Sequence, residues 1–225
     1  MRRGAVLLAA LLLPVLAGCD KKENAVGDPK QTSAEAGLDP NAIGAKGVSA
    51  LQWAMLKEDR ARFEALLDAG ADVGHADDTG DTIVLYAAKA NDVSYLNALL
   101  ARHVDLNGPN TLSGRTALMA ALLGERKPQF QMLLGAGANI NLADRSGDTA
   151  LHIAAQINEN HAVLELLKAD ADPLARNKQG VTFQRYMNMT PTKIMSEEAR
   201  ADRQAVTAWL LAHHVPIEPV PPPTR

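Results

Sequence analysis

The sequence has a single cysteine, few aromatic residues and no excess of positive charge. One cysteine in 225 residues excludes an internal disulfide, a Cys-x-x-Cys redox pair and a zinc site built from several cysteines. Lys and Arg number 23 against 26 Asp and Glu, so the chain lacks the basic surplus of nucleic-acid-binding proteins, and we expect no nucleic-acid partner. Apolar residues make up 47%, which excludes disorder across the whole chain.

Long hydrophobic runs are also scarce, and the one at the N-terminus is short. It extends over 13 residues from Ala5 to Ala17, whereas a membrane-spanning helix needs about 20. Two arginines precede it and polar residues follow, as in a secretory signal peptide. The small residues directly before Cys19 resemble a bacterial lipoprotein signal. This resemblance implies removal of residues 1–18, a lipid on the Cys19 thiol and a periplasm-facing place in the cell envelope. The alternative is a plain signal peptide with an incidental cysteine.

The residues after this cysteine predict a tether. In enteric bacteria an aspartate in the next position retains a lipoprotein in the inner membrane, so the resemblance favours that membrane through Asp20. Residues 19–46 are mostly small or polar, which indicates a lipid anchor followed by a flexible tether. Near its end, Asp39 and Pro40 have the chemistry of a helix start and predict a short capping helix.

The rest of the chain repeats with a period of 33 or 34 residues. Glycines recur at 47, 80, 114, 147 and 180, each followed two residues later by Ser or Thr, and the first four are followed after 19 residues by a Leu-Leu pair. Small residues between glycine and leucines predict an inner helix, the leucines an outer helix, and the polar stretch after them a hairpin finger. We therefore predict an all-α solenoid of about five repeats over 47–217, with units starting near 44, 77, 111, 144 and 177.

The fourth unit resembles an ankyrin repeat. The matching sequence runs Gly147-Asp148-Thr149-Ala150-Leu151-His152-Ile153-Ala154-Ala155. The resemblance implies that fingertips and inner helices form a concave surface for a protein partner. It also implies that His152 ties the finger to the inner helix by hydrogen bonds. Because the other units carry Gln52, Leu85 and Met119 there, we expect this brace in one unit only.

The repeat is irregular at two places. The connection from Leu100 to Gly114 is one residue longer than the others. In the last unit, glycine and Leu-Leu are 30 residues apart instead of 19, which predicts an insertion at about 190–200 and a helix start at Ser196. The insertion is either a tolerated feature of a terminal cap or a dedicated contact loop. The stretch from Val215 to Arg225 contains five prolines and predicts an extended tail, with 218–225 as its Pro-rich end.

No pattern of residues predicts catalysis. The six histidines are scattered over different positions, and the adjacent His213 and His214 point in different directions on a helix. Asp77, Asp78 and Asp81 lack the alternate spacing of a calcium loop, so we expect a solvated acidic finger there. The sequence therefore predicts no enzyme, no cofactor and no metal site.

The fingers change from acidic to basic along the stack, as expected of a surface that orients a partner. Exposed Leu112, Leu123 and Ile157 beside arginines have the composition of an interface centre. The candidate partner-binding residues are Asp78, Thr79, Asp81, Lys89, Leu112, Ser113, Arg115, Leu123, Arg145, Ser146, Asp148, Gln156, Ile157 and Lys178.

These features together predict a monomeric, lipid-anchored protein-binding module that scaffolds or regulates an envelope protein. The membrane contact is the lipid on Cys19, and the partner is a protein. One alternative is an immunity protein that inhibits a toxin acting in the periplasm, because a tethered rigid binder suits inhibition. Another is an enzyme of unrecognised mechanism, which strongly shifted pKa values clustered in one pocket would favour.

Overall fold

The computed structural model describes residues 39–219. Its α-helices are α1 (Ala50–Leu56), α2 (Arg60–Asp68), α3 (Ile83–Lys89), α4 (Val93–Leu100), α5 (Ala117–Leu123), α6 (Lys127–Gly135), α7 (Ala150–Gln156), α8 (Asn160–Lys168), α9 (Phe183–Met187) and α10 (Glu197–Ala212). Two short 3-10 helices span Ala45–Gly47 and Thr192–Ile194. Over this range there is no β-sheet, only two isolated bridges. The predicted signal peptide, Cys19, most of the tether and the end of the tail lie outside the described residues.

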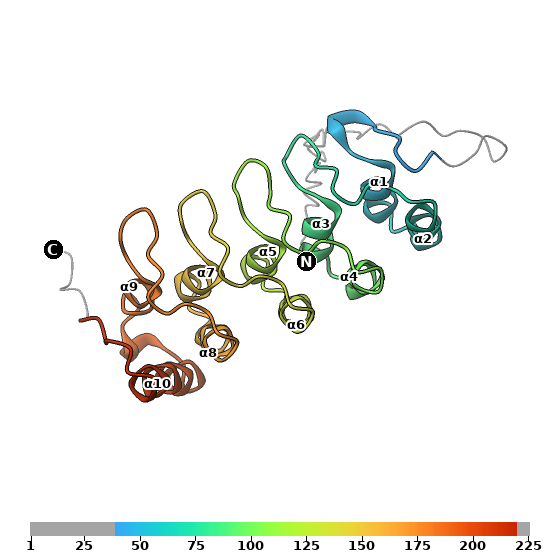
Figure 1. Ribbon diagram of the computed structural model, residues 1–225. Helices are drawn as coiled ribbons and strands as arrows, with labels where there is room; N and C mark the ends of the chain where they lie inside the picture. Colours follow the sequence, from blue (N-terminus) through green and yellow to red (C-terminus); the bar gives the residue numbers. More distant parts are fainter. Residues whose placement is uncertain (1–38, 220–225) are drawn as a thin grey trace, which may run out of the picture.

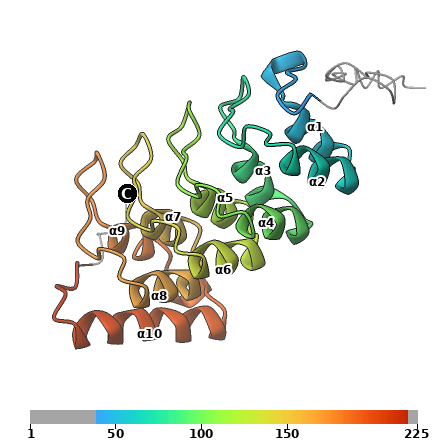
Figure 2. The same ribbon diagram turned by 45° about the vertical axis from the view of Figure 1, so that its right-hand side comes forward.

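The helices stack as five pairs (Figure 1). The inner helices α1, α3, α5, α7 and α9 form one row, and the outer helices α2, α4, α6, α8 and α10 form a second row beneath it. The segments that precede the inner helices project as fingers on the opposite side from the outer row. This arrangement confirms the predicted all-α solenoid of about five repeats. Figure 2 shows the long α10 lying beneath α8 at the end of the stack.

The repeated glycine and hydroxyl residues shape each finger and start each inner helix. The five hydroxyl residues (Ser49, Thr82, Thr116, Thr149 and Thr182) are the N-caps of α1, α3, α5, α7 and α9. The glycine two residues earlier has a positive φ in every unit. At Gly147, a Cβ would also lie 2.8 Å from the backbone nitrogen of Lys178 in the next finger. Glycine is therefore required there both for its conformation and for close approach of the fingers.

The leucine pairs form the seam between units. The first leucine of each pair has no exposed surface, namely Leu66, Leu99, Leu133, Leu166 and Leu210. Alanines of the inner helices, such as Ala88 and Ala121, are equally buried and let neighbouring helices approach closely. The burial of the second leucine varies between units: Leu167 is 1% exposed, whereas Leu211, in the last unit, is 61% exposed.

The predicted capping helix at Asp39 is wrong. The Asp39 carboxylate accepts a hydrogen bond from the Asn41 N–H at 3.0 Å and closes a turn. The chain then joins the first finger, where the Gly44 N–H donates to the Val48 carbonyl at 2.8 Å. A helix is not formed because the backbone groups that it would use pair within this finger. Contacts with the array already begin at Asn41, inside the range 19–46, since its side-chain oxygen accepts from the Asp72 N–H.

The expectation of a single brace was also wrong. In the fourth unit, His152 Nδ1 accepts from the Thr149 N–H at 3.2 Å and Nε2 donates to the Val181 carbonyl at 3.1 Å. In the first unit, Gln52 Oε1 accepts from the Ser49 N–H at 2.8 Å and its Nε2 donates to the Asp81 carbonyl at 2.7 Å. A glutamine amide has one acceptor and one donor end, as a neutral imidazole has, so it connects the finger and helix in the same way.

The last unit departs from the others after α9. The helix start predicted at Ser196 is confirmed, because its hydroxyl accepts from the Ala199 N–H and caps α10. The guanidinium of Arg203 in α10 donates to the carbonyls of Met187 and Thr190, which ties the inserted segment to α9. Residues 216–218 of the tail are held against α9, since the Gln184 amide donates to the Pro216 carbonyl at 2.9 Å and accepts from the Glu218 N–H at 3.0 Å.

Candidate protein-binding face

The surface formed by the fingers and inner helices, here called the inner face, repeats its side-chain positions from unit to unit. The residue six positions after each repeated glycine is, unit by unit, Trp53, Tyr86, Ala120, Ile153 and Tyr186. The residue nine positions after each of these glycines is Leu56, Lys89, Leu123, Gln156 and Met189. Four units carry a large side chain at the first of these positions. Because the third unit carries only Ala120 there, space is left in front of α5.

Two adjoining hollows open on the inner face. The first, of about 560 Å³, lies between the first and second units; Leu56 and Tyr86 line it from the inner row, and Arg60 of α2 and Tyr95 of α4 line it from the outer row. The second, of about 400 Å³, lies between the second and third units in front of Ala120 and is lined also by Arg115 and Leu123. Lys89 lines both hollows. They therefore form a groove along α3, and this groove is called the inner groove below.

The rims of the inner groove are apolar and its walls carry charges. Leu56 is 47% exposed and Leu123 is 39% exposed. The ammonium of Lys89 pairs with the carboxylate of Asp81, whose other oxygen accepts from the Asn110 amide at 2.8 Å. These contacts hold the Lys89 side chain across the middle of the groove, between its two apolar ends.

The acidic finger of the second unit is not fully solvated as predicted. Asp77 is buried, and its carboxylate accepts from the Tyr86 hydroxyl at 2.6 Å and from the Thr79 hydroxyl at 2.7 Å. Burial alone raises the pKa of Asp77, but these hydrogen bonds together with backbone N–H groups hold the pKa below its ordinary value. Burial and the hydrogen bond to Asp77 also raise the pKa of Tyr86, so the phenol remains the donor. Asp78 alone of the three aspartates is exposed.

Most of the predicted contact residues lie at the surface of the fingers and inner helices. Asp78, Thr79, Lys89, Leu112, Arg115, Leu123, Arg145, Ser146, Gln156 and Lys178 are exposed, and Asp81 and Ser113 are half-buried. Lys89, Leu123 and Arg115 come together at the inner groove with Asp81 and Ser113. Leu112, Arg145 and Lys178 lie on successive fingers instead.

Two predicted contact residues need correction. Asp148 is 8% exposed, because its carboxylate accepts from the Asn177 amide at 2.7 Å and from the Gln156 amide at 2.9 Å. It fastens one finger to the next and is not exposed. Ile157 is half-buried and packs against the hydrophobic core, so it is not part of an exposed interface centre.

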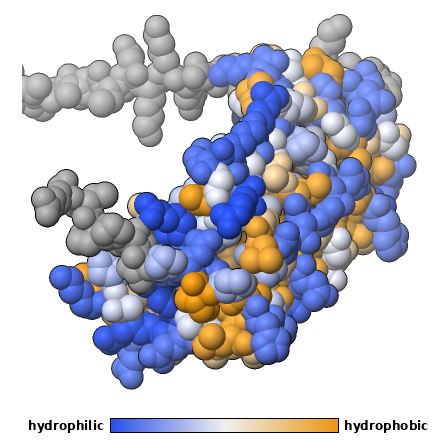
Figure 3. Space-filling view, turned by 60° about the vertical axis from the view of Figure 1, so that its left-hand side comes forward, coloured by the Kyte–Doolittle hydropathy of each residue, from blue (hydrophilic) through white to orange (hydrophobic). Residues whose placement is uncertain are grey.

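Sequence reasoning missed several residues around these surfaces. Leu56 and Tyr86 line the inner groove, and their register relative to Leu123 and Ala120 was the signal that could have identified them. Figure 3 brings the C-terminal units forward and shows apolar patches bordered by polar side chains. In the last unit, Met189 is 63% exposed and Ile194, in the insertion, is 69% exposed.

The histidines of residues 39–219 form no candidate metal site. Within that range no group of three or more His, Cys, Asp or Glu side chains is placed to hold a metal ion. The His213 ring stacks on Trp209 with ring centres 3.9 Å apart, and its Nδ1 contacts the Trp209 carbonyl. None of the helices in the described part of the chain combines the length and the apolar character needed to cross a bilayer.

Comparison with known proteins identifies the repeat. A family model described as ankyrin repeats (3 copies) matches residues 51–144 and 97–177, which together cover more than half of the chain. The chain belongs to the ankyrin-repeat family. Ankyrin-repeat domains are typically binding modules without catalytic activity.

Individual relatives agree with this assignment. Protein PhlB of Serratia liquefaciens is 43% identical over 115 residues, which are 51% of this chain and 51% of PhlB. The putative ankyrin repeat protein YahD of Escherichia coli is 28% identical over 160 residues, 69% of this chain and 80% of YahD. The crystal structure of the ankyrin repeat domain of Bcl-3 superimposes with a TM-score of 0.64 at 26% identity, covering 75% of this chain and 72% of that domain. The chain thus spans about half the length of PhlB.

Proposed function

We propose that this ankyrin-repeat protein is lipid-anchored in a bacterial envelope and binds a protein partner in the inner groove, thereby scaffolding or regulating that partner. The observation that carries the proposal is the pair of adjoining hollows that share Lys89. Exposed Leu56 and Leu123 provide apolar contact area beside the charged side chain of Lys89, and protein interfaces combine apolar area with polar groups in this way.

Ala120 supplies the most specific feature of the groove. The equivalent positions hold a tryptophan in the first unit and tyrosines in the second and fifth. The alanine leaves a hollow of about 400 Å³ that one large apolar side chain of a partner fits, with Leu123 beside it. Lys89 and Arg115 would then contact polar groups around that side chain.

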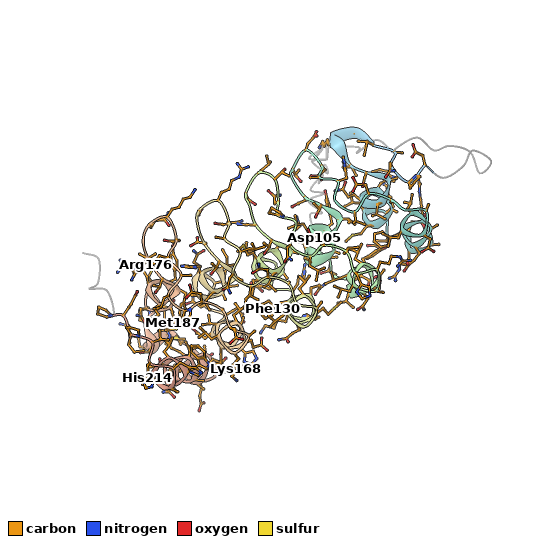
Figure 4. The ribbon with its side chains drawn as sticks, viewed as in Figure 1. Asp105, Phe130, Lys168, Arg176, Met187 and His214 are labelled. Carbon is orange, nitrogen blue, oxygen red and sulfur yellow. The ribbon has the colours of Figure 1, made fainter. Side chains whose placement is uncertain are left out.

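Filling this hollow tests the proposal. Ala120→Trp introduces a side chain that the first unit already accommodates in the same register, as Trp53. Lys168→Trp adds the same residue on α8, in the outer row (Figure 4), and serves as the control. We expect the lipidated parent and Lys168→Trp to capture one stoichiometric partner from envelope extracts of the source cells, and Ala120→Trp to lose it. Equal capture by all three proteins would exclude the inner groove as the binding site.

The anchor is tested separately. The proposal places the lipid on Cys19, so Cys19→Ser should abolish incorporation of a labelled fatty acid and release the protein from the membrane fraction into the periplasm. If the variant stays in the membrane fraction and the parent incorporates no label, the lipoprotein part of the proposal is wrong while partner capture is unaffected. An inner-membrane location, favoured by Asp20, is tested by separating the two membranes of the parent cells.

A further inference from the structure

The fingers of the fourth and fifth units carry exposed basic side chains without carboxylate partners. These are Arg145 on the fourth finger and Arg176 and Lys178 on the fifth, called the cationic fingers below. Among the described residues, no carboxylate lies within 4.0 Å of their charged nitrogens. Their charge is therefore open to solvent and to any anion that approaches.

The two aspartates of the fourth finger do not offset this charge at the surface. Asp144 and Asp148 are each 8% exposed. Asp144 accepts hydrogen bonds from the backbone N–H groups of Ser146 and Asp148 inside its own finger. Since Asp148 is held by side-chain amides, both carboxylates are used to build the fingers and leave the outer surface positive.

Hydrogen bonds hold the cations in a fixed row. The Lys178 N–H donates to the Ser146 carbonyl at 2.9 Å, and the Arg145 N–H donates to the Ser113 carbonyl at 2.9 Å, so neighbouring fingers are joined directly. The Arg145 guanidinium donates to the Thr111 carbonyl at 2.5 Å. The Arg176 guanidinium, on the last finger in Figure 4, donates to the Gly180 carbonyl at 2.6 Å. Each guanidinium keeps further donors for a ligand.

The same register position has a different character at the other end of the row. The residue whose N–H donates to the preceding finger is Asp78, Thr111, Arg145 and Lys178 in successive fingers, all exposed. In the longer third finger, exposed Leu112 follows Thr111. The row of fingertips thus changes from negative through apolar to positive. A uniform polyanion, such as an anionic membrane or a nucleic acid, would meet repulsion at Asp78, whereas a protein segment can match each position in order.

We propose that the cationic fingers bind an acidic segment of the partner protein, and that this contact fixes the direction in which the partner lies along the array. The inference rests on the proposed function, because it names the chemistry of the partner that occupies the inner face. The acidic residues lie over the fourth and fifth fingers, and apolar residues lie toward Leu112. Charge complementarity of this kind speeds encounter and selects orientation.

A synthetic peptide tests the charge requirement without the natural partner. The probe is a fluorescein-labelled peptide with glutamates at one end, leucines in the middle and lysines at the other end; a peptide of the same composition with alternating charges is its control. Binding to the full chain is followed by fluorescence anisotropy at low and at physiological salt. We expect the graded peptide to bind more tightly than the alternating one, with an affinity that falls as salt rises.

Matched charge reversals locate the contact. Arg145→Glu with Lys178→Glu changes the cationic fingers, whereas Lys168→Glu with Arg200→Glu makes the same change in net charge on α8 and α10. We expect the first pair to weaken binding of the graded peptide by at least about tenfold and the second to leave it unchanged. Circular dichroism of both variants should match the parent, because all four side chains are exposed.

Two results would overturn the inference: no binding of the graded peptide, and equal weakening of its binding by both charge reversals. In the first case, binding of phosphatidylglycerol vesicles would show that the fingers contact a lipid surface instead. Capture from envelope extracts separates this failure from failure of the proposed function. If Ala120→Trp abolishes capture and the reversal of Arg145 and Lys178 does not, the inner groove remains the binding site and the acidic-segment inference is wrong.

Discussion

The fourth and fifth units contain the same repeated residues but differ in what covers them. The fourth unit, built on α7 and α8, has a neighbour on each side, and its second seam leucine, Leu167, is 1% exposed. The fifth unit, built on α9 and α10, has one neighbour, and its equivalent Leu211 is 61% exposed. A repeat in a stacked array derives much of its stability from its neighbours, so identical residues stabilise the two units to different extents.

The open side of the fifth unit is covered only in part. The tail at 216–218 bonds to Gln184 of α9, where an earlier unit would contact the next finger. Within the unit, Arg203 of α10 ties the inserted segment to α9. These contacts are smaller than those of a whole neighbouring repeat, which predicts that the end of the array opens before its centre.

The largest effect is expected from removing a seam leucine in the centre. Leu133 and Leu210 are both fully buried, so truncation to alanine creates a cavity in either unit. Leu133→Ala should lower the free energy of unfolding by about 2–5 kcal/mol, since the central units cannot open without exposing both neighbours. Leu210→Ala should cost less, because the last unit can open alone. Urea denaturation followed by circular dichroism measures both, and equal losses would contradict the difference between the units.

Replacing Gly147 or Gly180 should destabilise the fold less than removing a central leucine, and the two changes form a closely matched pair. Gly147 and Gly180 have φ angles of 82° and 75°, so alanine at either position strains the backbone by about 1–2 kcal/mol. Only at Gly147 does the new Cβ also meet the backbone of a following finger, whereas nothing lies within 4 Å of it at Gly180. We expect Gly147→Ala to lower the melting temperature more than Gly180→Ala. The reverse order would show that the fingers do not contact each other as described.

Loss of the tail contact should act locally, at the last unit. Gln184→Ala removes two hydrogen bonds between α9 and the tail, each of which contributes about 0.5–1.5 kcal/mol. The Glu218 amide should then exchange with deuterium faster, while the amides of α7 keep their protection. Gln179→Ala, an exposed side chain of the same unit, is the control and should change neither. Unchanged exchange at Glu218 would mean that Gln184 does not hold the tail.

The smallest effect is a difference in acid sensitivity between the second and fifth fingers. The pKa of Asp77 in the folded state is held below its ordinary value of 3.8. The ionised carboxylate therefore stabilises the fold fully above pH 3.8, and this stabilisation is lost as the pH falls from there through the lowered pKa. The equivalent residue of the fifth finger is Asn177, whose amide contacts the Tyr186 hydroxyl and cannot titrate in this range. Asp77→Asn should therefore flatten the acid side of the stability curve measured by urea denaturation. An unchanged acid slope would exclude Asp77 as a contributor.

The sequence predicted the helices and fingers well because the glycine, hydroxyl and leucine positions have direct local causes. The glycines need a positive φ, the hydroxyls cap helices, and one leucine of each pair is buried. Several of the errors concern contacts between units. Whether Asp148 is exposed depends on Asn177, which lies 29 residues later in the sequence, and Gln52 acts as a brace only because the next finger presents a carbonyl to it. Such partners are fixed by how units stack.

Part of the candidate site could also be predicted from the sequence. Lys89, Arg115 and Leu123 were expected on the inner face and line one hollow together. The hollow itself was not foreseen, because it arises from the absence of a large side chain at Ala120 and from the neighbouring units that surround it. The charge gradient of the fingertips was visible in the sequence, whereas the burial of the compensating Asp144 and Asp148 was not.

Hydrogen exchange of the captured complex tests the central claim most directly. The full chain is labelled with deuterium alone and with its partner bound, and protection is mapped by mass spectrometry. We expect added protection at the C-terminal ends of α3 and α5 and at the fingers of the fourth and fifth units, with none on α6, α8 or α10. Added protection confined to α6, α8 or α10 would contradict it, because the partner would then bind the face opposite the inner groove.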